Sequence, residues 1–207
     1  TFMKMLTIGS GILVMFSSSK YLKFIKIFKI EYPILILSAI LGMMIMISSN
    51  DLIVFYLGLE IQAMSLYVLT SFNRENIFST ESGIKFFVLS ALSSGLLLYG
   101  CSLIYGFSGT TNFNLISENN LFEAKYGITF GIVFILVGLS FKISAVPFHM
   151  WAPDVYEGSP TSVTLFFSIV PKIAALTVFI RFLYVPFLNL IDQWQLILVF
   201  LSIASMI

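Results

Sequence analysis

The stretch PILILSAILGMMIMI, residues 33–47, decides the fold class of this chain. It is apolar on every face, whereas a membrane-spanning barrel strand shows about ten residues of alternating apolar and polar character. A backbone in hydrocarbon must satisfy its own hydrogen bonds, so only helices and closed barrels cross a bilayer. The sequence therefore predicts membrane-spanning helices.

The composition of the whole chain agrees with this stretch. Of the 207 residues, 58% are hydrophobic and 10% are charged, and the mean hydropathy is +1.01. A soluble domain has about a quarter of its residues charged, and a helix needs ~20 apolar residues to cross a bilayer. We predict an all-α polytopic membrane protein with about seven transmembrane helices, whose expected spans are 3–18, 33–49, 51–72, 82–105, 127–150, 159–184 and 188–207.

Charge and cysteine content exclude several function classes. The net charge of +1 argues against a nucleic-acid surface. Cys101 is the only cysteine, which excludes an intramolecular disulfide and any all-cysteine iron–sulfur or zinc site. The sequence has no Gly-rich phosphate loop and no strand–helix alternation. We therefore expect no cofactor, metal or nucleic acid on this chain.

Lysines are concentrated in the loop between the first two predicted spans. Lys20, Lys23, Lys26 and Lys29 recur at every third position, with apolar residues between them. Cytoplasmic and matrix loops carry an excess of Lys and Arg, so we expect this loop on the inner side. A positive-inside anchor is preferred here to lipid-specific binding. Residues 50–51 and the polar loop 106–126 are then expected on the opposite side.

Three ionisable side chains lie deep inside predicted spans: Glu60, Lys142 and Lys172. Each is more than two turns from either end of its span, so a surface position does not explain it. A charge in hydrocarbon costs a few kcal/mol or more and usually faces a polar interior path. We predict such a path here, and static structural ion pairs are the alternative.

Lys142 and Lys172 are expected at nearly the same depth. If the turn between their spans centres near Val155, the two lysines lie 13 residues before it and 17 after it. At a rise of 1.5 Å per residue, the depths differ by ~6 Å. Two ammonium groups at one depth disfavour each other's charge, as does the apolar surrounding. At least one should be neutral, or stabilised by water or a carboxylate, as a proton relay requires.

Lys85 has two interpretations. It lies only about one turn into its predicted span, so it can extend to the inner interface. A straight hairpin between its span and the preceding one would offset it from Glu60 by ~13 Å. A longer helix start or a bridging water would close that gap, so a Glu60–Lys85 pair stays open.

Two prolines mark the helices that carry the deep lysines. Pro147 lies inside its predicted span and Pro171 directly precedes Lys172. Each removes a backbone N–H and frees the carbonyl of the residue four positions earlier, Ile143 in the first case. Broken helices beside buried charges are typical of transporters. His149, seven residues after Lys142 on the same helical face, either passes protons to the aqueous edge or is held by a backbone carbonyl.

A stripe of glycines is expected to support close helix packing. Gly127, Gly131 and Gly138 share one face of the predicted span 127–150, and the first two form a small-xxx-small pair. Such pairs let two helix backbones approach closely. The partner helix stays open, and a companion chain is one candidate.

Three stretches carry a resemblance to a known family. They are FYLGLEIQAMSLYVL (55–69), ESGIKFFVLSALSSGLLLYG (81–100) and KISAVPFHMWAPDVYEGSPTSVTLFFSIVPKIAAL (142–176). With them the chain resembles the antiporter-like subunits of proton-pumping NADH:ubiquinone oxidoreductase, respiratory complex I, and among these subunit 2. The resemblance covers roughly residues 31–184.

The resemblance implies a fold and a set of site residues. Glu60 resembles the glutamate of the family's fifth helix, Lys85 the lysine of the sixth, Lys142 the lysine of the broken seventh and Lys172 the lysine of the eighth. The family fold has two inverted five-helix repeats. By this comparison, 1–32 is a leading helix with its basic inner loop, 33–184 is one five-helix proton-translocation repeat, and 185–207 begins a second repeat that is truncated or completed by another chain.

The resemblance also implies a function. We expect a membrane-arm subunit of an H⁺-translocating NADH:ubiquinone reductase that moves protons through a buried Glu/Lys relay coupled to quinone reduction elsewhere. NADH, FMN, iron–sulfur clusters and ubiquinone would be bound by other subunits. The expected partners are those subunits, membrane lipids and a companion chain that carries the second repeat. A structural scaffold of the membrane arm and a subunit of a cation/proton antiporter are the alternatives.

The expected location is the mitochondrial inner membrane. The abundance of Phe (22 residues), Ile and Lys is typical of an AT-rich coding genome such as an organelle's. The bacterial plasma membrane and the plastid thylakoid are the alternatives.

Overall fold

The computed structural model describes residues 1–25, 27–118 and 125–207, so Lys26 of the basic loop lies outside the described residues. The described residues contain nine α-helices and a short 3-10 helix, and their one β-feature is an isolated bridge between Asp51 and Asn112. The helices are α1 (Phe2–Phe24), α2 (Glu31–Ser48), α3 (Leu52–Thr70), α4 (Ile77–Ser108), α5 (Phe113–Glu118), α6 (Lys125–Ile143), α7 (Trp151–Gly158), α8 (Thr161–Tyr184), the 3-10 helix η1 (Leu188–Leu190) and α9 (Ile191–Met206).

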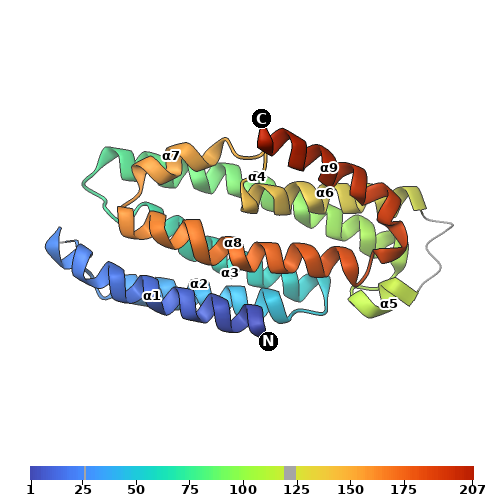
Figure 1. The fold of residues 1–207 in the computed structure, drawn as a ribbon, viewed down its shortest axis with the longest axis horizontal. Coiled ribbons are helices and arrows are strands. Elements are labelled where there is room, and N and C mark those ends of the chain that lie inside the picture. Colours follow the sequence, from blue (N-terminus) through green and yellow to red (C-terminus); the bar gives the residue numbers. More distant parts are fainter. Residues whose placement is uncertain (26, 119–124) are drawn as a thin grey trace.

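The long helices run side by side along the long axis of the molecule (Figure 1). In the described part of the chain, seven helical segments are long and apolar enough to cross a membrane. The predicted all-α polytopic fold and the predicted number of spans are therefore confirmed. Within the bundle, α3 packs against α2 and α4, and α6 packs against α4 and α8.

Residues 50–51 and the polar loop that follows α4 lie at the same end of the bundle, as expected. The Asn50 carbonyl accepts the N–H of Phe113, and the Asp51 carboxylate accepts the Thr111 hydroxyl at 2.6 Å. The loop after α2 and the polar loop after α4 thus share one end. The loop between α1 and α2 lies at the opposite end, beside the α3–α4 loop (Figure 1).

The predicted span 127–150 is wrong in its second half. Helix α6 ends at Ile143, near the middle of the long axis, and a non-helical segment leads to the short helix α7 (Figure 1). Pro147 explains the end, because its ring clashes with a helical carbonyl four residues earlier and it lacks an N–H. At the break, Ser144 adopts a φ of +64° and the Val146–Pro147 peptide bond is cis. Residues 151–158, expected as a turn, form a helix of two turns.

Other boundaries differ for local reasons. Helix α4 begins at Ile77 instead of residue 82, because the Asn76 side chain caps it by accepting the N–H of Phe78 at 3.0 Å. It continues to Ser108, where Gly109 at a φ of +70° ends it in the left-handed conformation. The short helix α5 was not predicted. The last helical segment starts at Leu188 with η1, as in the expected span 188–207.

The glycine stripe of α6 packs closely, as predicted, and its partner is α4. A methyl group on Gly131 would lie 2.7 Å from the Ile104 side chain and 3.0 Å from the Gly100 carbonyl, so only glycine fits. Gly138 meets Leu97 in the same way. This face is therefore occupied inside the chain and is not available to a companion chain.

Candidate functional site

Lys142 lies in the last turn of α6 and connects three helices. Its Nζ donates to the hydroxyl of Ser90 in α4 at 2.5 Å. The same hydroxyl accepts the phenolic O–H of Tyr67 from α3 at 2.8 Å. Ser90 is fully buried. Because hydroxyl groups both accept and donate, Tyr67, Ser90 and Lys142 form a continuous polar line through the interior of the bundle.

Glu60 lies on the same helix as Tyr67, two turns earlier. Its Oε1 is buried and has no hydrogen-bond partner among the described residues. Its carboxylate interacts with the hydroxyl of Tyr56, and it attracts the Lys142 ammonium through space. A buried carboxylate oxygen without a partner is destabilising by about 1–3 kcal/mol or more. Glu60 is therefore a buried carboxylate that the hydrogen bonds of the described residues do not fully satisfy.

Lys172, in α8, is bound at the point where α6 ends. Its Nζ donates to the carbonyl of Ile143 and to the hydroxyl of Ser144. The Ile143 carbonyl is the acceptor that Pro147 was predicted to free, so this prediction is confirmed. The same Nζ lies 5.7 Å from the centre of the Trp151 ring, within range of a cation–π interaction.

The two lysines line one small cavity. Its volume is about 20 Å³, which is room for about one water molecule. Gln62 and Ala63 of α3, Phe86 of α4 and Trp151 of α7 complete much of its wall. Lys172 also binds the residue next to Lys142 in the chain. The two lysines thus meet at one cavity, whereas their match in depth stays a prediction, and the turn assumed near Val155 is a helix.

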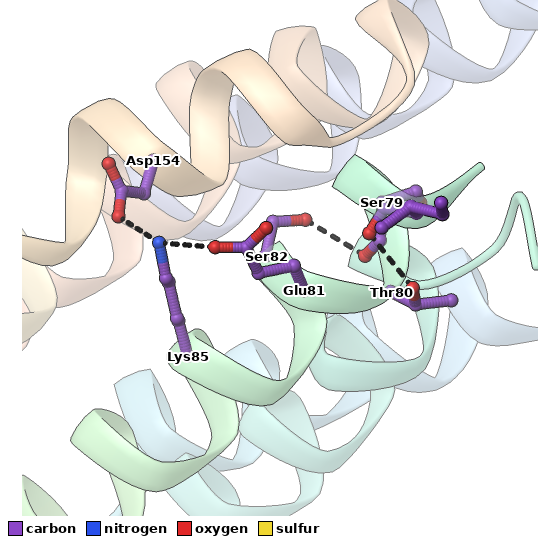
Figure 2. Close-up of polar contacts among 7 residues, drawn as sticks. Ser79, Thr80, Glu81, Ser82, Lys85 and Asp154 are labelled. Carbon is purple, nitrogen blue, oxygen red and sulfur yellow. Dashed lines mark hydrogen bonds and ion pairs between the residues drawn. The ribbon is translucent and has the colours of Figure 1, made fainter.

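Lys85 does not pair with Glu60. Figure 2 shows its amine between two carboxylates, Asp154 of α7 at 2.7 Å and Glu81 of its own helix at 2.8 Å. The Lys85 side chain is 45% exposed. Because α4 starts at Ile77, Lys85 lies about two turns into the helix, and the carboxylate it reaches comes from the segment after the break.

His149 lies in the segment between α6 and α7, so its predicted place on the helical face of Lys142 is wrong. That prediction assumed a continuous helix, and α6 ends at Ile143. The Nδ1 of His149 is buried and has no hydrogen-bond partner among the described residues. A backbone carbonyl therefore does not hold that nitrogen in the described part of the chain.

Sequence reasoning missed several side chains that shape the site. Tyr67 and Ser90 lie within stretches quoted above, yet a hydroxyl in an apolar span gives little signal by itself. Trp151 donates its indole N–H to the Phe141 carbonyl at 2.9 Å and so closes the end of α6. Among the described residues, no group of three or more His, Cys, Asp or Glu side chains could hold a metal ion.

Comparison with known proteins shows which family the chain belongs to. The family model described as "NADH:quinone oxidoreductase/Mrp antiporter, TM" matches residues 49–207. The chain belongs to this family. The resemblance noted from the quoted stretches is confirmed at this level.

Two named bacterial proteins are similar in sequence to almost the whole chain. NADH-quinone oxidoreductase subunit N of Pelagibacter ubique is 74% identical over the whole chain, which covers 44% of that protein. The protein of the same name from Rhodospirillum rubrum is 53% identical over 99% of the chain and 42% of its own length. The chain thus spans less than half the length of these relatives. They are bacterial and named subunit N, so they do not support a mitochondrial location or the name subunit 2.

Solved structures confirm the antiporter-like fold. A chain of respiratory complex I from Thermus thermophilus matches with a TM-score of 0.72 and 30% identity, over 86% of this chain and 38% of that one. A chain of an archaeal membrane-bound sulfane sulfur reductase matches with a TM-score of 0.69 and 32% identity, over 74% and 31%. The Mrp complex from Dietzia matches with a TM-score of 0.77 at 22% identity, over 89% and 35%, and shows the fold alone.

Proposed function

We propose that this chain is a proton-translocating part of the membrane arm of an NADH-quinone oxidoreductase. The observation that carries the proposal is the buried polar line from Tyr67 through Ser90 to Lys142, which meets Lys172 at a cavity of one-water size. The relatives named NADH-quinone oxidoreductase subunit N support the choice of enzyme.

The proposed mechanism moves protons between Glu60, Lys142 and Lys172. When the Lys142 ammonium transfers its proton toward the Glu60 carboxylate, Lys142 becomes a neutral amine that can take up another proton from Lys172 through a water in the shared cavity. Loss of positive charge from Lys142 also removes the attraction on the Glu60 carboxylate and favours its protonation. Quinone reduction elsewhere would bias these steps electrostatically. His149, in the break beside Lys172, is the proposed link toward the end that carries the basic loop.

In this proposal, the chain itself performs no redox chemistry. NADH, FMN, iron–sulfur clusters and quinone would be bound by other subunits of the complex. The proposed five-helix repeat, residues 33–184, would consist of α2, α3, α4, the broken pair α6 and α7, and α8. In the named relatives, the further residues belong to the same polypeptide. A companion chain with the second repeat remains a prediction, as does lipid binding.

The proposed location is a bacterial plasma membrane, because the named relatives are bacterial. A cation/proton antiporter subunit is the second candidate function, but its support is limited to the shared fold of the Mrp complex. A static scaffold is the third. The half-buried lysines are held by neutral oxygen atoms of Ser90, Ile143 and Ser144, whereas a scaffold built on ion pairs would place carboxylates there.

The test is Lys142→Ala in the assembled complex. We expect loss of proton pumping and of the coupled quinone reductase activity, because the central amine is gone, while oxidation of NADH by an artificial acceptor continues. Proton pumping is measured by dye quenching in membrane vesicles, normalised to assembled complex. Retained pumping, or equal loss of both activities in a fully assembled complex, would contradict the proposed function.

A further inference from the structure

The short helix α7 rests on the first turns of α4. The Gly158 backbone is so close that an added methyl group would lie 2.6 Å from the Phe78 carbonyl and 2.7 Å from Ser82. One turn further along α4, Lys85 binds Asp154 of α7 at 2.7 Å. Residues spaced by four and three positions share one face of a helix. Phe78, Ser82 and Lys85 thus form a seat for α7.

Lys85 is the charged contact in this seat. Two carboxylates approach its amine from different helices, as Figure 2 shows. An isolated exposed ion pair adds little stability. However, α7 has only eight residues, and a helix of that length depends on its contacts with the rest of the protein. Even a modest interaction such as the Lys85–Asp154 pair can therefore help to fix the position of α7 on α4.

The first residue of α7, Trp151, lines the cavity that the two deep lysines share. Trp151, which is buried, donates to the Phe141 carbonyl at the end of α6. Its ring packs at a tilt against Phe86, with centres 4.8 Å apart, and lies 5.7 Å from the Lys172 amine. Displacing α7 from its seat would thus change the end of α6 and the surroundings of Lys172 together.

We propose that Lys85 is a positioning residue and not a member of the proton path. Through Asp154 it holds α7 on α4, and α7 in turn holds Trp151 over the end of α6 and beside Lys172. This inference rests on the proposed function, because the geometry it preserves is that of the proposed relay.

The inference is tested with a charge-swap series in the assembled complex. Lys85→Met and Asp154→Asn should each lower coupled quinone reduction per assembled complex by about threefold to tenfold, as expected for contacting residues that act as a unit. Lys85→Arg should recover most of the activity, because an arginine keeps the charge that binds Asp154. The double variant Lys85→Asp with Asp154→Lys should exceed both single swaps.

Glu157→Gln is the matched control, since it neutralises an exposed carboxylate of the same helix, and it should leave activity unchanged. The inference is overturned if Lys85→Arg is as impaired as Lys85→Met, because arginine barely deprotonates and cannot replace a titrating lysine. It is also overturned if the double swap is no better than the single swaps, or if Lys85→Met keeps full activity. The Lys142→Ala test decides the proposed function separately. If Lys142→Ala loses coupling but the Lys85 and Asp154 variants do not behave as expected, the proposed function stands and only the positioning role of Lys85 is contradicted.

Discussion

Lys142 and Lys85 are both lysines within membrane-spanning helices, yet their surroundings differ. Lys142 points into the bundle and donates to a neutral hydroxyl, Ser90. Lys85 is nearly half exposed and lies between the carboxylates of Glu81 and Asp154. A neutral acceptor leaves an amine free to lose its proton, whereas two carboxylates hold the positive charge in place. The partner of a lysine, more than its position in a span, therefore indicates its role.

The largest effect is expected from replacing Lys142 with arginine, and the same replacement at Lys85 is the comparison. Lys142→Arg should lower coupled proton pumping by about tenfold or more, because a guanidinium cannot act as an acid–base group at neutral pH. Lys85→Arg should retain most of the pumping. The measurement is the initial rate of dye quenching in vesicles that contain equal amounts of assembled complex. Equal loss in the two variants would remove the distinction between the two lysines.

Ser90→Ala tests the neutral partner of Lys142. Removing the hydroxyl leaves the amine without its acceptor and cuts the connection to Tyr67, so coupled activity should fall by about tenfold, as for a hydrogen bond to a charged group.

Tyr67→Phe removes one hydroxyl but keeps the bond between Ser90 and Lys142. It should reduce activity by about fivefold, as for a neutral hydrogen bond. Quinone reduction and artificial-acceptor oxidation are compared in the same membranes, and a larger loss in Tyr67→Phe than in Ser90→Ala would reverse the proposed order.

The spans could be predicted from the sequence because bilayer thickness sets the length of apolar runs. The prediction that Lys142 and Lys172 lie at one depth assumed a hairpin that does not exist. The two lysines line one cavity because the break after Ile143 provides a carbonyl that Lys172 reaches directly. Hydropathy cannot show such a break, since residues 144–150 count as part of an apolar run whether or not they are helical. The prediction for His149 failed for this reason.

The partner of Lys85 could not be predicted either. Its contact with Asp154 joins residues 69 positions apart, and the segment 151–158 was expected as a turn. The contact between Lys85 and Glu81 could have been predicted from the sequence, because residues four apart on a helix face one another. The glycine stripe shows the same limit. Its close packing followed from its spacing, but its partner α4 is a fact of tertiary structure.

Glu81→Gln gives the smallest expected effect and sharpens the account of Lys85. Glu81 and Asp154 lie at nearly equal distances from the Lys85 amine, but Glu81 belongs to the same helix and Asp154 to α7. Removing the Glu81 charge therefore leaves the link between α4 and α7 intact. Exposed pairs within one helix contribute little, so coupled activity should change by about twofold at most. Asp154→Asn, which removes an equal charge at a similar distance, should cost clearly more activity per assembled complex. If the two variants are equally impaired, the charge around Lys85 matters and the docking of α7 does not.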